Sequence, residues 1–157
     1  MCADLSTENP SRRALRVAAA LLRGCGGTTV YLQIPPTAGD TADAGQLGID
    51  APNLKLIPLS PAVFHKNKNS DLVANQPQKY ELRISADSVA SQVAQLQLAD
   101  ADALFALASG VVVSGSLFLI EGYSGLEQQG QIYLYRLLLR DAITNWTLQD
   151  PDVAPQD

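Results

Sequence analysis

The sequence predicts an α+β fold: a small antiparallel sheet, curved or barrel-like, with an N-terminal helix, a central pair of helices and long loops. Two stretches, Thr28 to Ile34 and Lys79 to Ile84, alternate apolar and polar side chains as half-buried strands do. Apolar residues at helical spacing follow Pro10 and Ser85. The stretch from Val111 to Asp141 divides into three strands at turn-forming residues. A chain of 157 residues is most simply one domain.

The first predicted helix begins at Asn9 and Pro10, because asparagine is a favoured N-cap and proline is tolerated in the first turn. We expect it to run to about Arg23 and to end at Gly24. The apolar face of this helix carries Leu15, Ala18 and Leu22, with Val17 and Leu21 beside them, and the neighbouring face carries Arg12, Arg16 and Arg23. The arginine face is either a solvated surface or a contact site for an acidic partner, protein or DNA.

A long loop or extended arm is predicted over residues 37–61, after Pro35-Pro36 ends the first strand. Loops of this length in compact domains usually have a function of their own. Two apolar islands interrupt the segment, and the second could form an edge strand, because Pro58 would not be tolerated in a central strand. The islands supply four candidate interface residues, Leu47, Ile49, Leu54 and Leu56.

The middle of the chain predicts one strand followed by two helices. A short apolar patch at Ala62 to Phe64 leads into a polar loop, and the strand from Lys79 to Ile84 follows. Ser85 is expected to cap a helix that runs through about Leu96. Asp100 is expected to start a second, shorter helix that closes at Gly110.

A hairpin and a third strand are predicted between Val111 and Asp141. Ser114-Gly115 is a two-residue connection of the kind that joins antiparallel strands, here Val111 to Val113 and Leu117 to Ile120. The polar, glycine-punctuated segment from Gly122 to Gly130 is interpreted as a turn. The third strand runs from Gln131 to Arg140, with Tyr133, Tyr135, Leu137 and Leu139 on one face.

The ends of the chain differ in composition from its middle. We expect residues 1–9 to be a flexible N-terminus, 10–148 a single domain and 149–157 a flexible acidic tail. Trp146, the only tryptophan, is a candidate interface residue that docks the tail either on its own domain or on a neighbour. The net charge of −5 argues against a broad nucleic-acid surface, which would be basic.

No set of residues in the sequence predicts catalysis, a cofactor site or a metal site. His65 is the only histidine and lacks the cysteine or histidine neighbours of a zinc site, and no Gly-x-Ser-x-Gly elbow supplies a serine nucleophile. Cys2 and Cys25 are expected to be free thiols. The apolar run between Arg16 and Arg23 is too short for an export signal, and no stretch has the length of a membrane span.

The stretch VVVSGSLFLIEGYSGLEQQGQIYLYRLLLRD resembles the terminal hairpin of the small head-tail joining proteins of tailed bacteriophages, the stopper, adaptor, connector or neck proteins. The matching pieces are Ser114-Gly115, Leu117 to Ile120, and Tyr133 to Arg140. The resemblance covers only the C-terminal part of the chain, and the helical pair between Ser85 and Gly110 departs from it, because such proteins often lack helices there.

The resemblance implies a structural virion protein that joins the phage head or portal to the tail as part of a homo-oligomeric ring. Its partners would be other copies of itself and portal, adaptor or tail proteins, with passive proximity to DNA and no membrane. It would be made in the cytoplasm of the bacterial host and would have no chemistry of its own. The competing interpretation is a cytoplasmic domain that binds a small molecule or a protein without catalysis. An enzymatic module that uses the pocket a curved sheet makes under a helix is a third interpretation.

Overall fold

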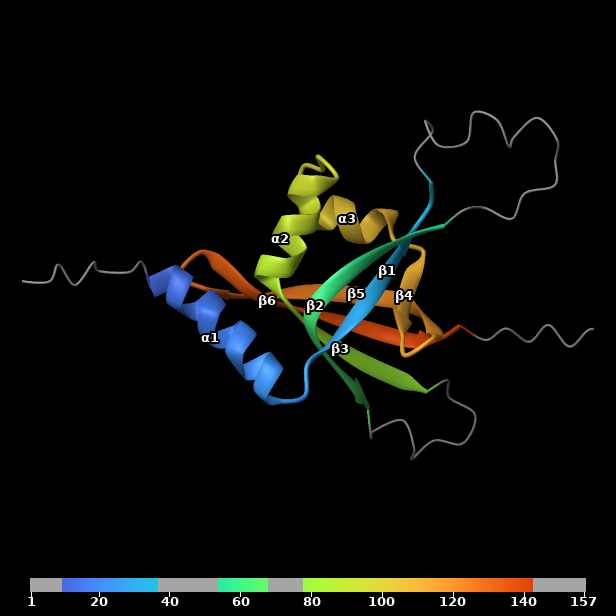
Figure 1. Ribbon diagram of the computed structural model, residues 1–157, viewed down its shortest axis with the longest axis horizontal. Helices are drawn as coiled ribbons and strands as arrows, with labels where there is room; N and C mark the ends of the chain where they lie inside the picture. The colour runs from blue at the N-terminus through green and yellow to red at the C-terminus, as the bar shows by residue number, and fades with distance from the viewer. Residues whose placement is uncertain (1–9, 37–53, 68–77, 143–157) are drawn as a thin grey trace, which may run out of the picture.

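The computed structural model describes residues 10–36, 54–67 and 78–142 of the chain. The described residues form helices α1 (Pro10–Gly24), α2 (Ala86–Gln95) and α3 (Ala101–Leu107) and strands β1 (Thr28–Ile34), β2 (Lys55–Lys66), β3 (Lys79–Ser85), β4 (Gly110–Val113), β5 (Ser116–Gln128) and β6 (Gln131–Asp141). The strands close into an antiparallel barrel in the order β1-β2-β3-β6-β5-β4 (Figure 1). The predicted α+β fold with a barrel-like sheet is confirmed.

The interior of the barrel is filled by the side chains that point inward from alternate positions of the strands. Leu32 of β1 and Leu137 and Leu139 of β6 are fully buried, whereas Leu138, one residue out of phase, is exposed. This alternation is the one that the sequence predicted for both strands. Other strands contribute Ile57, Leu59, Ala62, Leu82, Ile84, Val111, Val113 and Phe118 to the same core.

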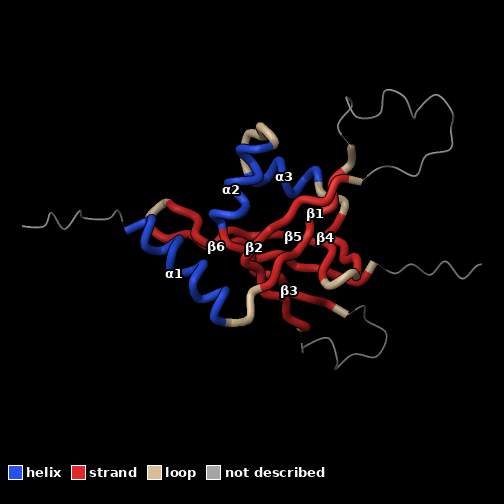
Figure 2. Tube along the Cα trace, viewed as in Figure 1, coloured by secondary structure: helices blue, strands red, loops and turns tan. Residues whose placement is uncertain are grey.

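The helices lie outside the strands (Figure 2). Helix α1 packs across β2, β3 and β6, and α2 contacts the same three strands. Helices α2 and α3 insert Val89, Leu104 and Phe105 into the core, and the Phe105 ring lies 4.9 Å from the Tyr123 ring and 5.4 Å from the Tyr135 ring. The helical pair therefore completes the core at one side of the barrel.

Strand β2 corrects the predicted extent of the long loop. It begins at Lys55, so residues 55–61 belong to a strand and not to the loop 37–61, and it continues through the apolar patch to Lys66. Its first part pairs with β1 and its last part with β3. Pro58 lies in the first part, which pairs with β1 on one side and faces α2 on the other. On the α2 side the Pro58 carbonyl accepts a hydrogen bond of 3.3 Å from Nε2 of Gln92. A proline is tolerated here because no strand needs its missing N–H.

Strand β5 corrects the predicted turn between Gly122 and Gly130. The strand continues to Gln128 and pairs with β6 along most of this segment, so the turn contains only Gln129 and Gly130. Both turn residues have positive φ, 52° and 78°, as do Ser114 and Gly115 in the confirmed hairpin, 50° and 82°. Positive φ at both central residues is the geometry of a type I′ hairpin.

Helix α1 ends at Gly24, as predicted, but differs from its prediction on its apolar side. The chain reverses two residues beyond the helix end, at Gly26, whose φ is +82°, and the amide of Gly27 donates to the Leu22 carbonyl at 2.9 Å. This is the Schellman arrangement. Ala18 and Leu22 are buried as expected, but Val17 and Leu21 are each more than half exposed. The buried face is thus narrower than the sequence indicated.

The two predicted helix caps behave differently. The Asp100 carboxylate accepts a hydrogen bond of 2.8 Å from the Ala103 amide, which confirms it as the cap of α3. Ser85 occupies the N-cap position of α2 but makes no side-chain cap, and its buried hydroxyl has no hydrogen-bond partner among the described residues. Ser85 is also the last residue of β3, where it pairs with Leu134, so the strand fixes its position.

Candidate interaction surfaces

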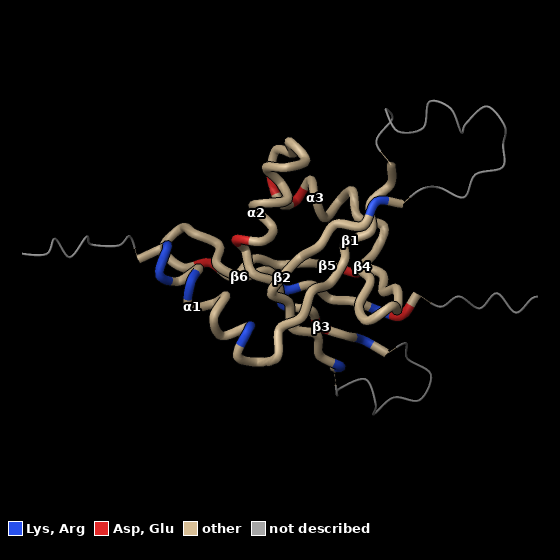
Figure 3. Tube along the Cα trace, viewed as in Figure 1, with Lys and Arg blue, Asp and Glu red and all other residues tan. Residues whose placement is uncertain are grey.

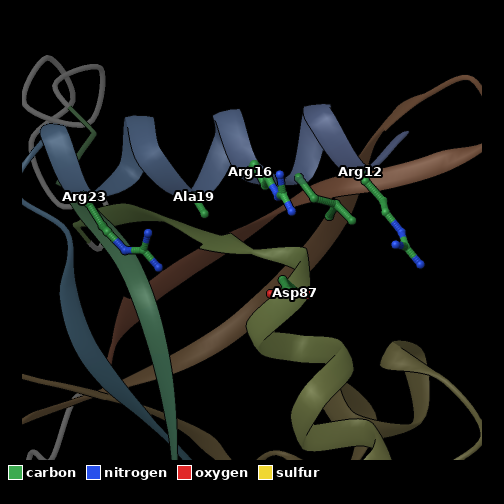
Figure 4. Close-up of a pocket in the computed structure, with 6 residues that line it drawn as sticks. Arg12, Arg16, Ala19, Arg23 and Asp87 are labelled. Carbon is green, nitrogen blue, oxygen red and sulfur yellow. The ribbon is translucent and has the colours of Figure 1, made fainter. Parts of the chain in front are cut away.

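An arginine-lined cleft separates α1 from the start of α2. We call it the arginine cleft; it has a volume of about 370 Å³ and is lined by Arg12, Leu15, Arg16, Ala19, Arg23 and Asp87. Figure 4 shows the three arginine side chains on the side of α1 that faces α2, with Asp87 of α2 opposite. The sequence predicted the arginine face, and the fold places it over a cleft. Among the residues that the structure describes, three guanidinium groups and one carboxylate line the cleft, and α1 carries the basic residues at this end of the molecule (Figure 3).

An apolar stripe, which we call the barrel stripe, crosses the outside of the barrel over β2, β1, β4 and β5. The strand register places Pro58 opposite Tyr31, Tyr31 opposite Val112, and Val112 opposite Leu117. Leu56 extends the barrel stripe on β2. Tyr31 is 42% exposed, Leu117 38% and Leu56 50%. An exposed apolar row of this kind is typical of a surface that binds another macromolecule.

A second apolar surface lies under α1. A groove of about 280 Å³, which we call the helix groove, is lined mainly by apolar side chains from α1, β2 and β6, with His65 and Arg83 at polar positions. Its remaining lining residues are Ala18, Leu21, Leu22, Cys25, Val63, Tyr133 and Leu134. Because Leu21, one of the lining residues, is 64% exposed, the groove is open to the surface along α1.

A buried carboxylate joins β3 to β6 on the outside of the barrel. Glu81 is only 9% exposed, although the sequence placed it on the polar face of its strand. Its carboxylate accepts from Nε of Arg83 at 2.8 Å and from Nη2 of Arg136 at 2.6 Å. Burial acts to raise the pKa of Glu81, but the hydrogen bonds from Arg136 and Arg83 outweigh it and hold the pKa below its ordinary value. Both carboxylate oxygens are therefore occupied, which suits a structural role and not proton transfer.

Two tyrosines beside α3 have altered acidity. The pKa of Tyr135 is raised by burial and by the nearby carboxylates of Asp102 and Asp100. The pKa of Tyr123 is raised by the same causes, with a hydrogen bond to Asp102 in addition. Both phenols are protonated at neutral pH, since even an ordinary tyrosine pKa lies well above it, and Tyr123 donates its proton in the hydrogen bond to Asp102.

The candidate interface residues from the sequence are only partly brought together. Arg12, Arg16 and Arg23 share the arginine cleft, and Leu54 and Leu56 are exposed at the start of β2. Leu47, Ile49 and Trp146 lie outside the described residues. The sequence missed Tyr31 and Leu117, which face outward on their own strands and are brought into one row, with Val112 between them, only by the pairing register.

The described residues form a small closed barrel with three helices, and their surface carries the arginine cleft, the barrel stripe and the helix groove. Within residues 10–36, 54–67 and 78–142, no group of three or more His, Cys, Asp or Glu side chains is placed to hold a metal ion. None of the described helices combines the length and the apolar character that a membrane span requires. Comparison of the chain with family models, with curated proteins and with solved structures finds no match in any of the three.

Proposed function

We propose that this protein is a structural component of a phage virion, one subunit of a ring that joins the head or portal to the tail. The barrel stripe is the observation that carries the proposal, because a row of apolar side chains across four paired strands is a surface that a neighbouring copy can bury. The resemblance of the C-terminal hairpin to head-tail joining proteins is the reason for proposing a phage head-tail ring as the assembly. The protein acts by geometry and has no catalytic step.

The proposed ring forms by contact between the barrel stripe of one copy and a different surface of the next. A contact between two different patches generates a ring when its rotation closes. Tyr31, Leu56 and Leu117 are about half exposed in the single chain, so burying them fully would contribute about 1 kcal/mol each. Apolar burial of this size supplies association, and charged surfaces select the orientation of the neighbour.

In this proposal DNA passes near the protein without being held by it. The barrel interior is occupied by core side chains, so DNA would pass through the centre of a ring and not through a subunit. A strongly basic lining would bind the phosphate backbone and hinder sliding. The net charge of −5 is compatible with passive proximity to DNA.

Negative-stain images of the purified full chain, alone and mixed with a phage portal, test the proposal. We expect rings of uniform diameter that disappear in Tyr31→Glu, because a charge in the barrel stripe cannot be buried without a partner. Ser124→Glu is the matched control, since Ser124 is exposed on β5 away from the stripe. Separate particles of single-chain size in both samples would contradict the proposal.

The helix groove favours a second candidate, a cytoplasmic domain that binds an apolar small molecule or an apolar peptide. Its volume of about 280 Å³ and its apolar lining suit such a ligand. The probe is the dye 8-anilinonaphthalene-1-sulfonate. A monomeric chain whose dye fluorescence is strong and is abolished by Leu21→Asp would support this candidate; a chain that forms rings and leaves the dye dark would exclude it.

A further inference from the structure

We propose that the helix groove of one copy receives the barrel stripe of the next copy, with Tyr31 of the incoming copy seated in the groove. The inference rests on the proposed function and names the second surface of the ring contact, which that proposal leaves open. Three features of the described residues carry it: the positions of the two surfaces on the barrel, the match between an exposed tyrosine and the groove lining, and the exposure of the groove along α1.

The barrel stripe and the helix groove lie on opposite sides of the barrel. In the closed order β1-β2-β3-β6-β5-β4, strand β6 stands opposite β1, and β3 stands opposite β4. The stripe is centred on β1 and β4, whereas the groove lies between α1 and the strands β2, β3 and β6. One copy therefore cannot place its own stripe in its own groove, and a contact between the two surfaces joins different copies.

A contact between opposite sides of the subunit is the kind that builds a ring of many copies. Each copy offers its stripe to one neighbour and its groove to the other, so the contacts run head to tail. When the two surfaces face in opposite directions, each contact turns the next copy by a small angle, and small rotations close only after many copies. A contact of stripe against stripe would instead join two copies about a twofold axis and stop at a dimer.

Tyr31 has the chemistry that the groove lining accommodates. It stands in the middle of the stripe, between Pro58 and Val112, and is 42% exposed. A buried tyrosine contributes a large apolar ring and needs a hydrogen-bond partner for its hydroxyl. The groove, of about 280 Å³, is lined mainly by apolar side chains and has His65 and Arg83 at polar positions, so it supplies both an apolar site and polar groups.

The groove is open to a neighbouring copy along α1. Leu21, one of its lining residues, is 64% exposed, and Val17, one helical turn earlier, is 56% exposed. These two are the most exposed of the large apolar side chains among the described residues. Cys25 also lines the groove and is exposed. A neighbour that seats Tyr31 in the groove covers these side chains, so both copies lose exposed apolar surface.

Mixing two variants of the full chain, each of which keeps one half of the contact, tests the inference. Tyr31→Glu keeps the groove and Leu21→Asp keeps the stripe. Each alone should be folded and sediment as a monomer, because a charge in the contact cannot be buried without a partner. An equimolar mixture should give a dimer of one copy of each variant and nothing heavier, since one intact stripe and one intact groove remain to meet. Ala20→Asp is the matched control, exposed on the same helix outside the groove lining, and should assemble as the wild type does.

Alkylation of Cys25 gives an independent measurement, because this thiol lines the groove and is exposed in the single chain. In a Cys2→Ser background, iodoacetamide should modify Cys25 at least about tenfold more slowly in the assembled chain than in Tyr31→Glu, since only the dissociated fraction exposes the groove. Equal rates in the two samples, rings formed by Leu21→Asp, or a mixture of the two variants that stays monomeric would overturn this contact and leave the ring itself standing. A wild-type chain that never self-associates would instead refute the proposed function, and this contact with it.

Discussion

Replacement of Glu81 by glutamine tests the link between β3 and β6. Glu81 is nearly buried, and its two oxygens accept short hydrogen bonds from Arg83 and Arg136. Hydrogen bonds to a charged group contribute about 1.5–3 kcal/mol when they are buried. Both arginine side chains are nearly half exposed, at 49% and 47%, so solvent screens the pair and we expect Glu81→Gln to cost about 1–2 kcal/mol at pH 7.

The sign of the pH dependence follows from the pKa of Glu81. The pKa is lowered in the folded protein relative to its ordinary value of 4.5. The stabilisation is therefore fully present above pH 4.5 and is lost as the pH falls through the lower, folded pKa. The substituted glutamine side chain carries no such charge, so the difference in unfolding free energy between the wild type and Glu81→Gln should shrink below pH 4.5.

Urea unfolding at pH 7 and at acid pH, followed by circular dichroism, measures this difference. Glu121→Gln is the matched control, because Glu121 is 30% exposed and its ion pairs with Lys79 and Arg140 are longer, at 3.6 and 3.8 Å. We expect the control to cost less than about 0.5 kcal/mol. Equal losses for the two variants at pH 7, or a Glu81→Gln loss that does not shrink in acid, would refute the reasoning.

Two further substitutions test the packing of the barrel. Tyr135→Asp should unfold the domain or destabilise it by about 4 kcal/mol, because it removes the ring contact with Phe105 and places a charge beside Asp102. Unchanged thermal stability would refute the assignment of this face of β6 to the core. Gly110→Ala should lower the free energy of unfolding by about 1–3 kcal/mol, because the new Cβ would lie 2.6 Å from the Phe118 carbonyl oxygen. Gly122→Ala is the control, since a Cβ there meets nothing within 4 Å. Equal urea midpoints for the two variants would contradict this prediction.

The strands and caps that follow a local rule could be predicted from the sequence. The alternation in β1 and β3, the Ser114-Gly115 turn and the Asp100 cap each depend on a few adjacent residues. Strand β5 was predicted too short, because Gly122 and Gly125 gave the segment the composition of a turn. Gly125 has a packing reason, because a Cβ on it would lie 2.9 Å from the Ile132 side chain, whereas a Cβ on Gly122, which follows the bulge after Ile120, would meet nothing within 4 Å.

The candidate surfaces, too, could be predicted only where they depend on residues close together in the sequence. Helical spacing was enough to place Arg12, Arg16 and Arg23 on one face, but not to place Asp87 across from them, which depends on how α2 packs. The barrel stripe could not be predicted, because Tyr31 and Leu117 come to lie on either side of Val112 only when β4 pairs with both β1 and β5. Long-range pairing of this kind leaves no signal in the local pattern of one sequence.

Sedimentation velocity of the full chain and of Tyr31→Glu over a range of concentrations tests the central claim most directly. The account predicts that the wild type forms one discrete species several times heavier than the 16.7 kDa chain, and that Tyr31→Glu remains folded but sediments as a monomer. A wild-type chain that sediments at 16.7 kDa at every concentration, or a Tyr31→Glu variant that assembles as the wild type does, would contradict it.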